Sequence, residues 1–200
     1  MKTKPLTEAT SAAILDAAAR LMITEGRADP PLSQVAAAAG VSRQSVYLGF
    51  GGRAGLLAAL LERAARQSNA VTSFEAMTVN PVLNARRLTA MAEAWMDHLA
   101  EIHPVVTLLD AASLSDPDAL AAGRAFAQRW RGAFEATLSQ SDPVWALRDS
   151  LTPSAAADLL WSAMDVRAWR GLVVESGWTP EAFRSSRVVF LRRMILMRIV

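Results

Sequence analysis

The stretch that decides the fold is residues 32–50, LSQVAAAAGVSRQSVYLGF. Its first half repeats apolar residues at helical spacing, so one face of a short helix can be buried. Gly40 follows, where a helix commonly ends in a left-handed glycine. Ser42 can cap a second helix, because its hydroxyl can accept a hydrogen bond from a free backbone N–H group. With Val46 and Phe50 pointing inward one turn apart, the stretch predicts two short helices joined by a tight turn.

The second of these helices leaves polar side chains on its outer face. Arg can bond guanine O6 and N7 together, and Gln can bond adenine N6 and N7 together. Ser and Tyr hydroxyls reach phosphate oxygens, which set the register of a protein on DNA. The pattern is typical of a helix-turn-helix that reads DNA, although a small packing motif with accidental charge is the alternative. The candidate DNA contacts are Ser33, Ser42, Arg43, Gln44, Ser45, Tyr47, Leu48 and Arg53.

We expect Arg43, Gln44 and Ser45 to contact bases. Tyr47, Arg53 and Ser33 would contact phosphate. Arg53 opens the next helix, where its guanidinium and the helix N-terminus can share one phosphate.

The charge distribution agrees with a nucleic-acid partner. The chain has a net charge of only +2. Residues 1–66 hold eight Lys and Arg against five Asp and Glu, whereas residues 67–200 hold thirteen against fourteen. No acidic residue occurs between Pro30 and Leu61. The end of the chain that carries the helix-turn-helix is therefore the basic end, as binding to a polyanion requires.

Residues 14–60 resemble the N-terminal domain of TetR-family transcription regulators. The resemblance implies a DNA-binding domain there, and elsewhere it rests only on length and helical character. Leu48, Gly49 and Pro31 depart from the family's usual residues, where hydroxyl, aromatic or imidazole side chains are common. The segments that carry the resemblance are ILDAAARLM (14–22), VAAAAGVSRQSVYLGF (35–50) and RAGLLAAL (53–60).

Composition excludes several other classes. The chain is 52% hydrophobic, which is ample for a core, and it has no cysteine, which rules out disulfides and thiolate chemistry. No apolar stretch approaches the roughly 18 residues of a spanning helix, and no signal peptide is evident, so we expect a cytoplasmic protein. No motif of a hydrolase, phosphate loop or metalloprotease occurs, so we expect neither an enzyme nor a cofactor. His98 and His103 make only a weak case for a metal.

Helical periodicity and the absence of alternating segments predict an all-α protein. An N-terminal three-helix helix-turn-helix domain would precede a C-terminal helical bundle for ligand binding and dimerisation. We expect domains at 1–52 and 81–200, joined by a connecting helix and polar linker at 53–80. Thr7 or Thr10 would cap the first helix, which would run to about Glu25. Later helices are expected at about 82–102, 104–113, 117–140, 153–176 and 180–198. The breaks follow from Pro81, Pro104 and the cap-proline pairs Asp116-Pro117, Asp142-Pro143, Thr152-Pro153 and Thr179-Pro180.

Aromatic side chains and Met dominate the faces of the expected bundle helices. Together they can line an adaptable cavity for an apolar or aromatic small molecule, although ordinary core packing is the alternative for each residue. The carboxylates Asp116 and Asp118 are better explained as cap and first-turn residues than as a site. The candidate ligand contacts are Met91, Trp95, His98, Phe126, Trp130, Trp161, Asp165 and Trp169.

The last two helices are apolar on more than one side, which indicates a partner. The TetR resemblance implies that they pair with those of a second copy. Our leading hypothesis is a homodimeric repressor that a small apolar or aromatic effector releases from a palindromic operator. The alternative is an α-helical adaptor whose helix-turn-helix serves protein contacts, and an enzyme in the bundle has no residues to support it.

Overall fold

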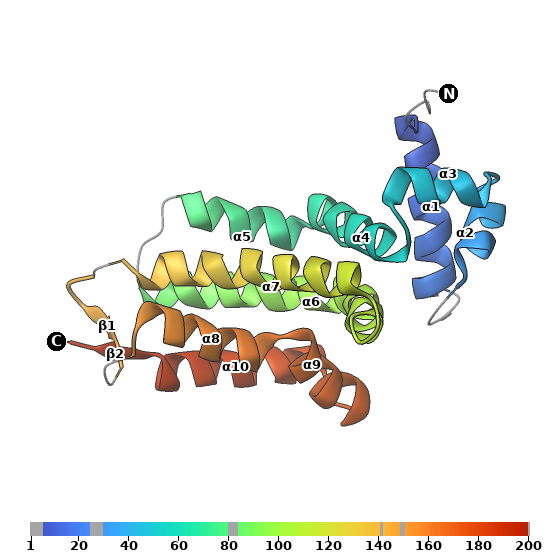
Figure 1. Cartoon of the computed structure of the whole chain (residues 1–200). Helices are drawn as coiled ribbons and strands as arrows, with labels where there is room; N and C mark the ends of the chain where they lie inside the picture. The colour runs from blue at the N-terminus through green and yellow to red at the C-terminus, as the bar shows by residue number, and fades with distance from the viewer. Residues whose placement is uncertain (1–5, 25–29, 80–83, 141, 149–150, 200) are drawn as a thin grey trace. The chain divides into compact units, whose positions relative to one another are not determined.

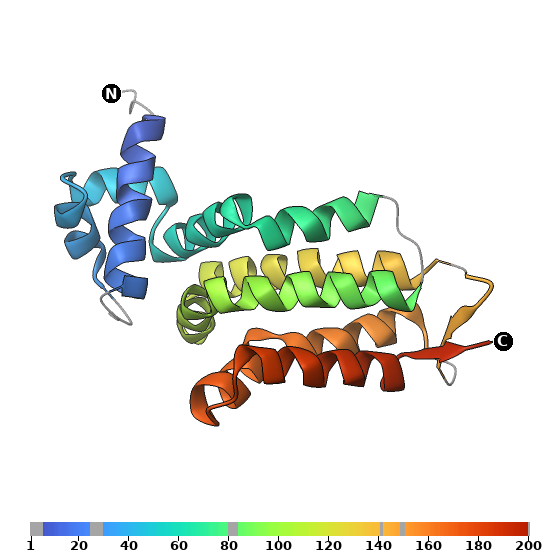
Figure 2. The same ribbon diagram turned by 180° about the vertical axis from the view of Figure 1, so that it is seen from behind.

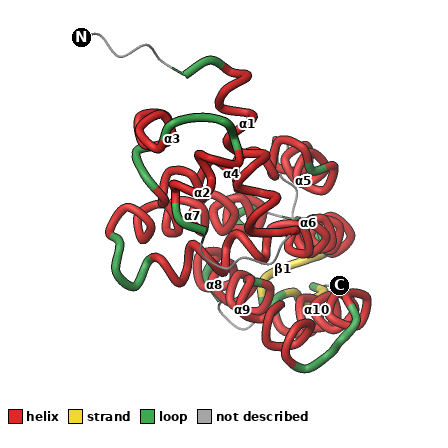
Figure 3. The backbone as a smooth tube through the Cα atoms, turned by 90° about the vertical axis from the view of Figure 1, so that its right-hand side faces the viewer, coloured by secondary structure: helices red, strands yellow, loops and turns green. Residues whose placement is uncertain are grey.

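The computed structural model describes residues 6–24, 30–79, 84–140, 142–148 and 151–199. The described chain is almost entirely helical, as predicted (Figure 1). Among the described elements the exceptions are the two short strands β1 and β2, and strands are drawn in yellow in Figure 3. The elements in order are α1 (Glu8–Ala19), the π-helical turn η1 (Arg20–Thr24), α2 (Leu32–Ala38), α3 (Arg43–Phe50), α4 (Arg53–Gln67), α5 (Asn69–Val79), α6 (Ala85–Ala112), α7 (Pro117–Leu138), β1 (Trp145–Leu147), α8 (Pro153–Met164), α9 (Val166–Trp169), the π-helical turn η2 (Arg170–Glu175), α10 (Pro180–Met194) and β2 (Leu196–Arg198).

The chain forms two compact units. One comprises residues up to Ala64 together with Pro104–Ala125, and the other comprises Ala65–His103 together with Phe126 onward. The expected division at 1–52, 53–80 and 81–200 follows sequence order alone and stays a prediction.

In the first unit, α1, α2 and α3 pack around a small apolar core (Figure 1). Ile14, Ala18, Val35 and Val46 are fully buried. Thr7 caps α1, because its hydroxyl oxygen accepts a hydrogen bond from Thr10 N at 3.2 Å. Apolar burial therefore fixes these three helices as one scaffold.

In the second unit, a larger core lies between long helices. Its fully buried side chains include Trp95, Trp130, Phe74 and Phe134. Helices α8 and α10 run side by side there (Figures 1 and 2). Thr152 caps α8 and Thr179 caps α10. The predicted cap-proline starts of these helices are therefore confirmed.

The prediction that Pro104 ends a helix is wrong, because α6 continues through it. A proline inside a helix cannot donate a hydrogen bond to the carbonyl four residues earlier. That carbonyl belongs to Ala100, and His103 Nδ1 lies 3.2 Å from its oxygen. The imidazole can therefore donate the hydrogen bond that the proline cannot.

The polar part of the expected connection at 53–80 contains helix α5. Its polar residues include Thr72 and Ser73 on the exposed side, while Val71 and Phe74 are buried. The buried hydroxyl of Ser68 lies 3.4 Å from Val71 N, so it supports the first turn of the helix. Composition alone suggested a loop because the helix buries only a narrow face. Pro81 lies outside the described residues.

The pair Asp142-Pro143 does not start a helix. Asp142 Oδ1 accepts hydrogen bonds from Val144 N and Trp145 N, both at 2.8 Å, and this turn leads into β1. Strand β1 pairs antiparallel with β2, with Trp145 opposite Arg198. The last helix therefore ends at Met194 rather than at 198.

The expected helix 153–176 is interrupted at Asp165. This residue has extended backbone angles, φ −78° and ψ 173°, and its Oδ1 accepts a hydrogen bond from Ala168 N at 2.8 Å. Asp165 thus ends α8 and caps α9, an effect that helical periodicity cannot reveal.

Candidate nucleic-acid interface and aromatic core

Helix α3 is held in place by local features that the sequence shows. Gly40 has φ 68°, the left-handed conformation expected after α2. Ser42 is extended, and its hydroxyl oxygen accepts a hydrogen bond from Ser45 N at 3.0 Å. Val46 is fully buried and anchors the helix on the scaffold. Gly51, with φ 71°, ends the helix, so that both ends of α3 are defined.

The outer face of α3 carries most of the predicted DNA contacts. Arg43 and Gln44 are exposed, and Tyr47 and Leu48 are exposed to 59% and 53%. Ser45 is half-buried, with its hydroxyl 2.8 Å from that of Ser42.

Outside α3, Ser33 is exposed on α2, and Ser42 is exposed at the cap. Arg53 is half-buried at the start of α4. The scaffold thus brings the predicted contacts of α2, α3 and α4 into one unit.

A polar pocket of about 340 Å³ lies beside α3 in the same unit. Partial burial lowers the pKa of Arg53, and the negative charge of Asp116 opposes that shift. Arginine nevertheless stays protonated at neutral pH, so Arg53 keeps its positive charge. The residues that line it are Leu32, Arg43, Tyr47, Phe50, Gly51, Gly52, Arg53, Ala54, Gly55, Asp116 and Asp118.

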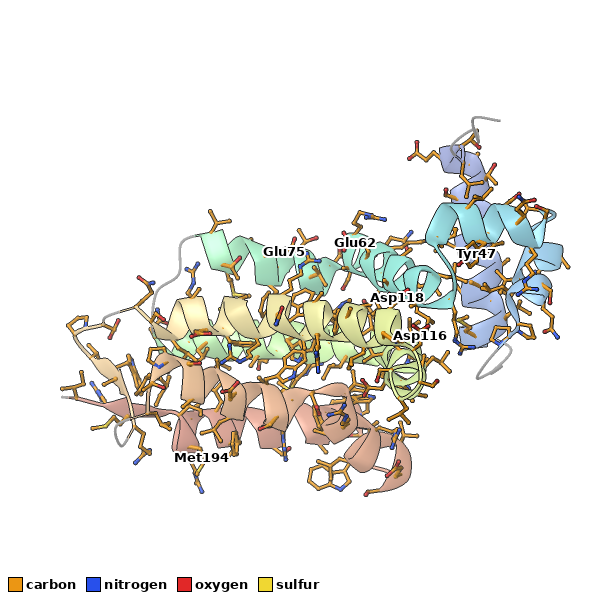
Figure 4. All side chains as sticks on the ribbon, viewed as in Figure 1. Tyr47, Glu62, Glu75, Asp116, Asp118 and Met194 are labelled. Carbon is orange, nitrogen blue, oxygen red and sulfur yellow. The ribbon has the colours of Figure 1, made fainter. Side chains whose placement is uncertain are left out.

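Asp116 and Asp118 are the residues that sequence reasoning missed at this place (Figure 4). Their predicted role is confirmed for Asp116, whose Oδ1 accepts hydrogen bonds from Asp118 N at 2.9 Å and Ala119 N at 3.3 Å. The cap also places a carboxylate beside Arg53, some sixty residues away in sequence, and no local pattern could have indicated that.

The second unit contains a cluster of aromatic side chains around Trp95. Its ring centroid lies 4.9 Å from that of Trp130, 5.2 Å from Trp161 and 6.1 Å from Phe126. His98 joins the cluster, with its ring 5.6 Å from that of Trp130. Five of the eight predicted ligand contacts therefore lie together.

The other three predicted contacts have separate surroundings. Met91 is buried, with its sulfur 3.4 Å from the hydroxyl of Thr137. Asp165 caps α9, as described above. Trp169 packs its ring against Phe183 at 5.2 Å.

Two further rings belong to the aromatic cluster but were absent from the candidates. Phe74 lies 5.0 Å from Trp130 and 5.3 Å from Phe134, measured between ring centroids. Phe74 lies in the stretch 53–80, which was expected to be a connecting helix and a polar linker. The local signal for it is the pair Val71 and Phe74, two apolar residues at helical spacing.

The ring nitrogen atoms of the buried Trp and His side chains differ in whether they have a hydrogen-bond partner. Trp95 Nε1 donates a hydrogen bond to the carbonyl oxygen of Met164 at 2.7 Å. Within the described part of the chain, Trp130 Nε1 and His98 Nε2 have no hydrogen-bond partner. Burial lowers the pKa of His98, an effect that the nearby Glu101 carboxylate opposes.

The described residues contain no group of three or more His, Asp or Glu side chains placed to hold a metal ion. None of the described helices combines the length and apolarity needed to cross a bilayer.

Comparison with known proteins gives a family match over the helix-turn-helix. Residues 14–60 match the family model described as bacterial regulatory proteins, tetR family. No curated protein sequence matches the chain significantly.

Solved structures share the fold over almost the whole chain. A transcriptional regulator from Saccharomonospora viridis in complex with choline is 19% identical, with 96% of this chain and 100% of that one covered and a TM-score of 0.73. NalD, the secondary repressor of the MexAB-OprM multidrug efflux pump in Pseudomonas aeruginosa, is 22% identical, with 94% and 96% covered and a TM-score of 0.67. LfrR from Mycobacterium smegmatis, in complex with proflavine, is 22% identical, with 93% and 96% covered and a TM-score of 0.51.

The capped, exposed helix α3 on a buried three-helix scaffold defines a helix-turn-helix DNA-binding protein with a helical C-terminal part. The family match assigns residues 14–60 to the bacterial regulatory proteins of the tetR family, and solved regulators share the fold of the chain. This finding does not favour the adaptor alternative.

Proposed function

We propose that the protein is a homodimeric repressor that leaves its operator when a small apolar or aromatic molecule binds the second unit. The observation that carries the proposal is the exposed face of α3, which presents Arg43, Gln44 and Tyr47 from a helix fixed at both ends. As a regulator of this family, it would act on the chromosome in the cytoplasm, without catalytic activity.

Arg43 and Gln44 are the base-reading residues in this proposal, because both are exposed on the first turn of α3. Ser45 stays a candidate, although its hydroxyl is bonded to Ser42. Tyr47, Ser33 and Arg53 would hold phosphate, which sets register without reading sequence.

The proposed dimer uses α8 and α10. Each presents large apolar side chains to solvent, among them Leu159 on α8 and Val189 and Met194 on α10. One short helix makes few base contacts, so a two-fold mate is needed to address half-sites separated by about 34 Å or a multiple of it.

The proposed effector site is the aromatic cluster. Regulators of the same fold from S. viridis and M. smegmatis were solved with choline and proflavine, respectively. An effector can release DNA only if it binds the DNA-incompetent form of the protein more tightly than the competent form.

Two substitutions test the proposed division of roles. Gln44→Ala should relax base preference, since it removes a bidentate contact with the base edge. Arg53→Ala should weaken binding to all duplexes alike and reduce the salt dependence, because it removes a phosphate contact. Arg86→Ala, at an exposed arginine on α6, is the control and should change neither property.

Fluorescence anisotropy with duplexes from the DNA flanking the gene, and with scrambled versions of them, gives both quantities over a range of salt concentrations. Equal losses on cognate and scrambled DNA for Gln44→Ala and Arg53→Ala would contradict the proposed roles.

A further inference from the structure

His98 is a buried histidine, and one of its two ring nitrogen atoms has no hydrogen-bond partner among the described residues. Its side chain is only 1% exposed. Nδ1 lies 3.3 Å from Oε2 of Glu101, and because a carboxylate accepts, Nδ1 carries the proton. In the neutral ring Nε2 is then an acceptor, and it has no partner among the described residues. Burial favours the neutral ring by lowering the pKa of His98.

Trp130 supplies the complementary group. It is 2% exposed, and an indole N–H can only donate. Its Nε1 has no partner in the described part of the chain. The neighbouring Trp95, by contrast, donates to the carbonyl of Met164. Because buried polar groups are normally paired, an unpaired donor and an unpaired acceptor in one cluster need an explanation.

Both groups belong to one aromatic cluster that reaches the surface. The ring centroids of His98 and Trp130 are 5.6 Å apart. Phe126 and Trp161, 6.5 Å apart, are half-exposed and form the outer side of the cluster. A ligand packed against these two rings would therefore bind the same cluster that contains the two unpaired nitrogen atoms.

The two nitrogen atoms discriminate between ligand polar groups. A carboxylate only accepts, so it would satisfy Trp130 and leave His98 Nε2 unpaired. An ammonium group only donates, so it would leave Trp130 unpaired. A hydroxyl does both, because its oxygen accepts one hydrogen bond and its hydrogen makes another. The charged side chains that act on His98 are Glu101, bonded to Nδ1, and Arg129, which lies over the Trp130 ring and is paired with Glu75.

We propose that the effector is a hydroxylated aromatic compound of the phenol class. Its ring would pack against Trp161 and Phe126, and its hydroxyl would accept from Trp130 Nε1 and donate to His98 Nε2. This inference rests on the proposed function, since it names the chemical class of the effector for the same site.

Isothermal titration of the full-length protein with three probes tests it. The probes are 2-naphthol, 2-methoxynaphthalene, which cannot donate, and 2-naphthoate, which only accepts. We expect 2-naphthol to bind about tenfold more tightly than either of the other two probes. This is the change in affinity that the loss of one buried hydrogen bond produces.

His98→Leu should bind the three probes with similar affinity, because it removes the acceptor that distinguishes them. Trp130→Phe should bind 2-naphthol more weakly than the wild type does but keep its preference over 2-methoxynaphthalene, because His98 Nε2 still needs a donor. His103→Leu, a substitution of the half-buried histidine on the same helix, is the matched control and should keep the preference. Thermal unfolding of each variant shows whether it is folded. If His98→Leu does not fold, the binding of the probes to Trp130→Phe still tests the proposal.

The proposal is overturned if 2-naphthol does not bind, or if the three probes bind with the same affinity, as they would if a water molecule already bonded to both nitrogen atoms. It is also overturned if His103→Leu loses the preference for 2-naphthol as His98→Leu does. No DNA is involved. Failure of this test with operator binding intact rejects only the effector class, whereas failure of DNA binding rejects the proposed function.

Discussion

The cap of α3 gives the sharpest link between local structure and DNA binding. Ser42→Ala removes the acceptor of the 3.0 Å hydrogen bond from Ser45 N and the 2.8 Å contact with the Ser45 hydroxyl. Loss of a serine cap costs about 1 kcal/mol, within a range of about 0.5 to 2. For a chain of this size that corresponds to a fall in Tm of roughly 2–4 °C. The frayed first turn of α3 would carry Arg43 and Gln44, so we also expect weaker binding to cognate duplexes.

Two matched variants separate stability from DNA binding. Thr152→Ala removes the same kind of cap from α8, a hydrogen bond of 3.2 Å to Ala155 N, outside the helix-turn-helix. It should lower Tm by a similar amount while leaving DNA affinity unchanged. Ser42→Asn keeps an oxygen acceptor at the cap, so it should restore Tm.

Thermal unfolding by circular dichroism and anisotropy titration of a cognate duplex measure the two effects. Protein concentrations should stay well above those at which the dimer dissociates. If Thr152→Ala weakened DNA binding as much as Ser42→Ala, or if Ser42→Ala changed neither quantity, the role assigned to the cap would be refuted.

Three further predictions test other parts of the structure. Asp116→Asn keeps an acceptor for the first turn of α7 but removes the negative charge beside Arg53. Anisotropy titration should therefore show tighter binding to all DNA duplexes, most clearly at low salt. An unchanged affinity for DNA would contradict this expectation. Gly55→Ala would drive its methyl group into the backbone of Phe50, whose carbonyl carbon would lie at 2.9 Å, whereas Gly49→Ala meets only a flexible side-chain end. Calorimetry should therefore show a larger loss of Tm for Gly55→Ala, and equal values would be inconsistent with this packing. The lowered pKa of His98 means that the unfolded chain binds more protons than the folded chain, so the free energy of unfolding should fall as the pH drops below about 6.5. Chemical denaturation over a range of pH should show a shallower fall for His98→Leu than for the wild type. An identical fall would exclude this histidine as the cause.

The helix-turn-helix could be predicted because its signals are local. The cap at Ser42, the turn at Gly40 and the buried Val46 lie within a few residues of one another, and each determines its own backbone or packing. Predictions failed where a distant or compensating partner decides the outcome. Pro104 reads as a break, but His103 can donate to the carbonyl that the proline leaves unbonded.

The candidate sites show the same limit. Helical spacing identified Trp95, Trp130 and Trp161 as members of an aromatic face, and the structure brings them together. Spacing could not show that Asp116 lies beside Arg53, because only tertiary packing joins these parts of the chain. Nor could it show which buried nitrogen atoms lack a partner, which depends on every side chain around them.

The stoichiometry of the complex with DNA tests the central claim most directly. Sedimentation of the purified protein with a duplex from the DNA flanking its own gene, at low salt and without added small molecule, gives the number of chains bound. We predict two chains per operator, with the complex lost in Arg43→Ala/Gln44→Ala. A protein that stays monomeric and ignores these duplexes, or a variant that binds them as the wild type does, would contradict the assignment of α3 as the DNA-reading helix.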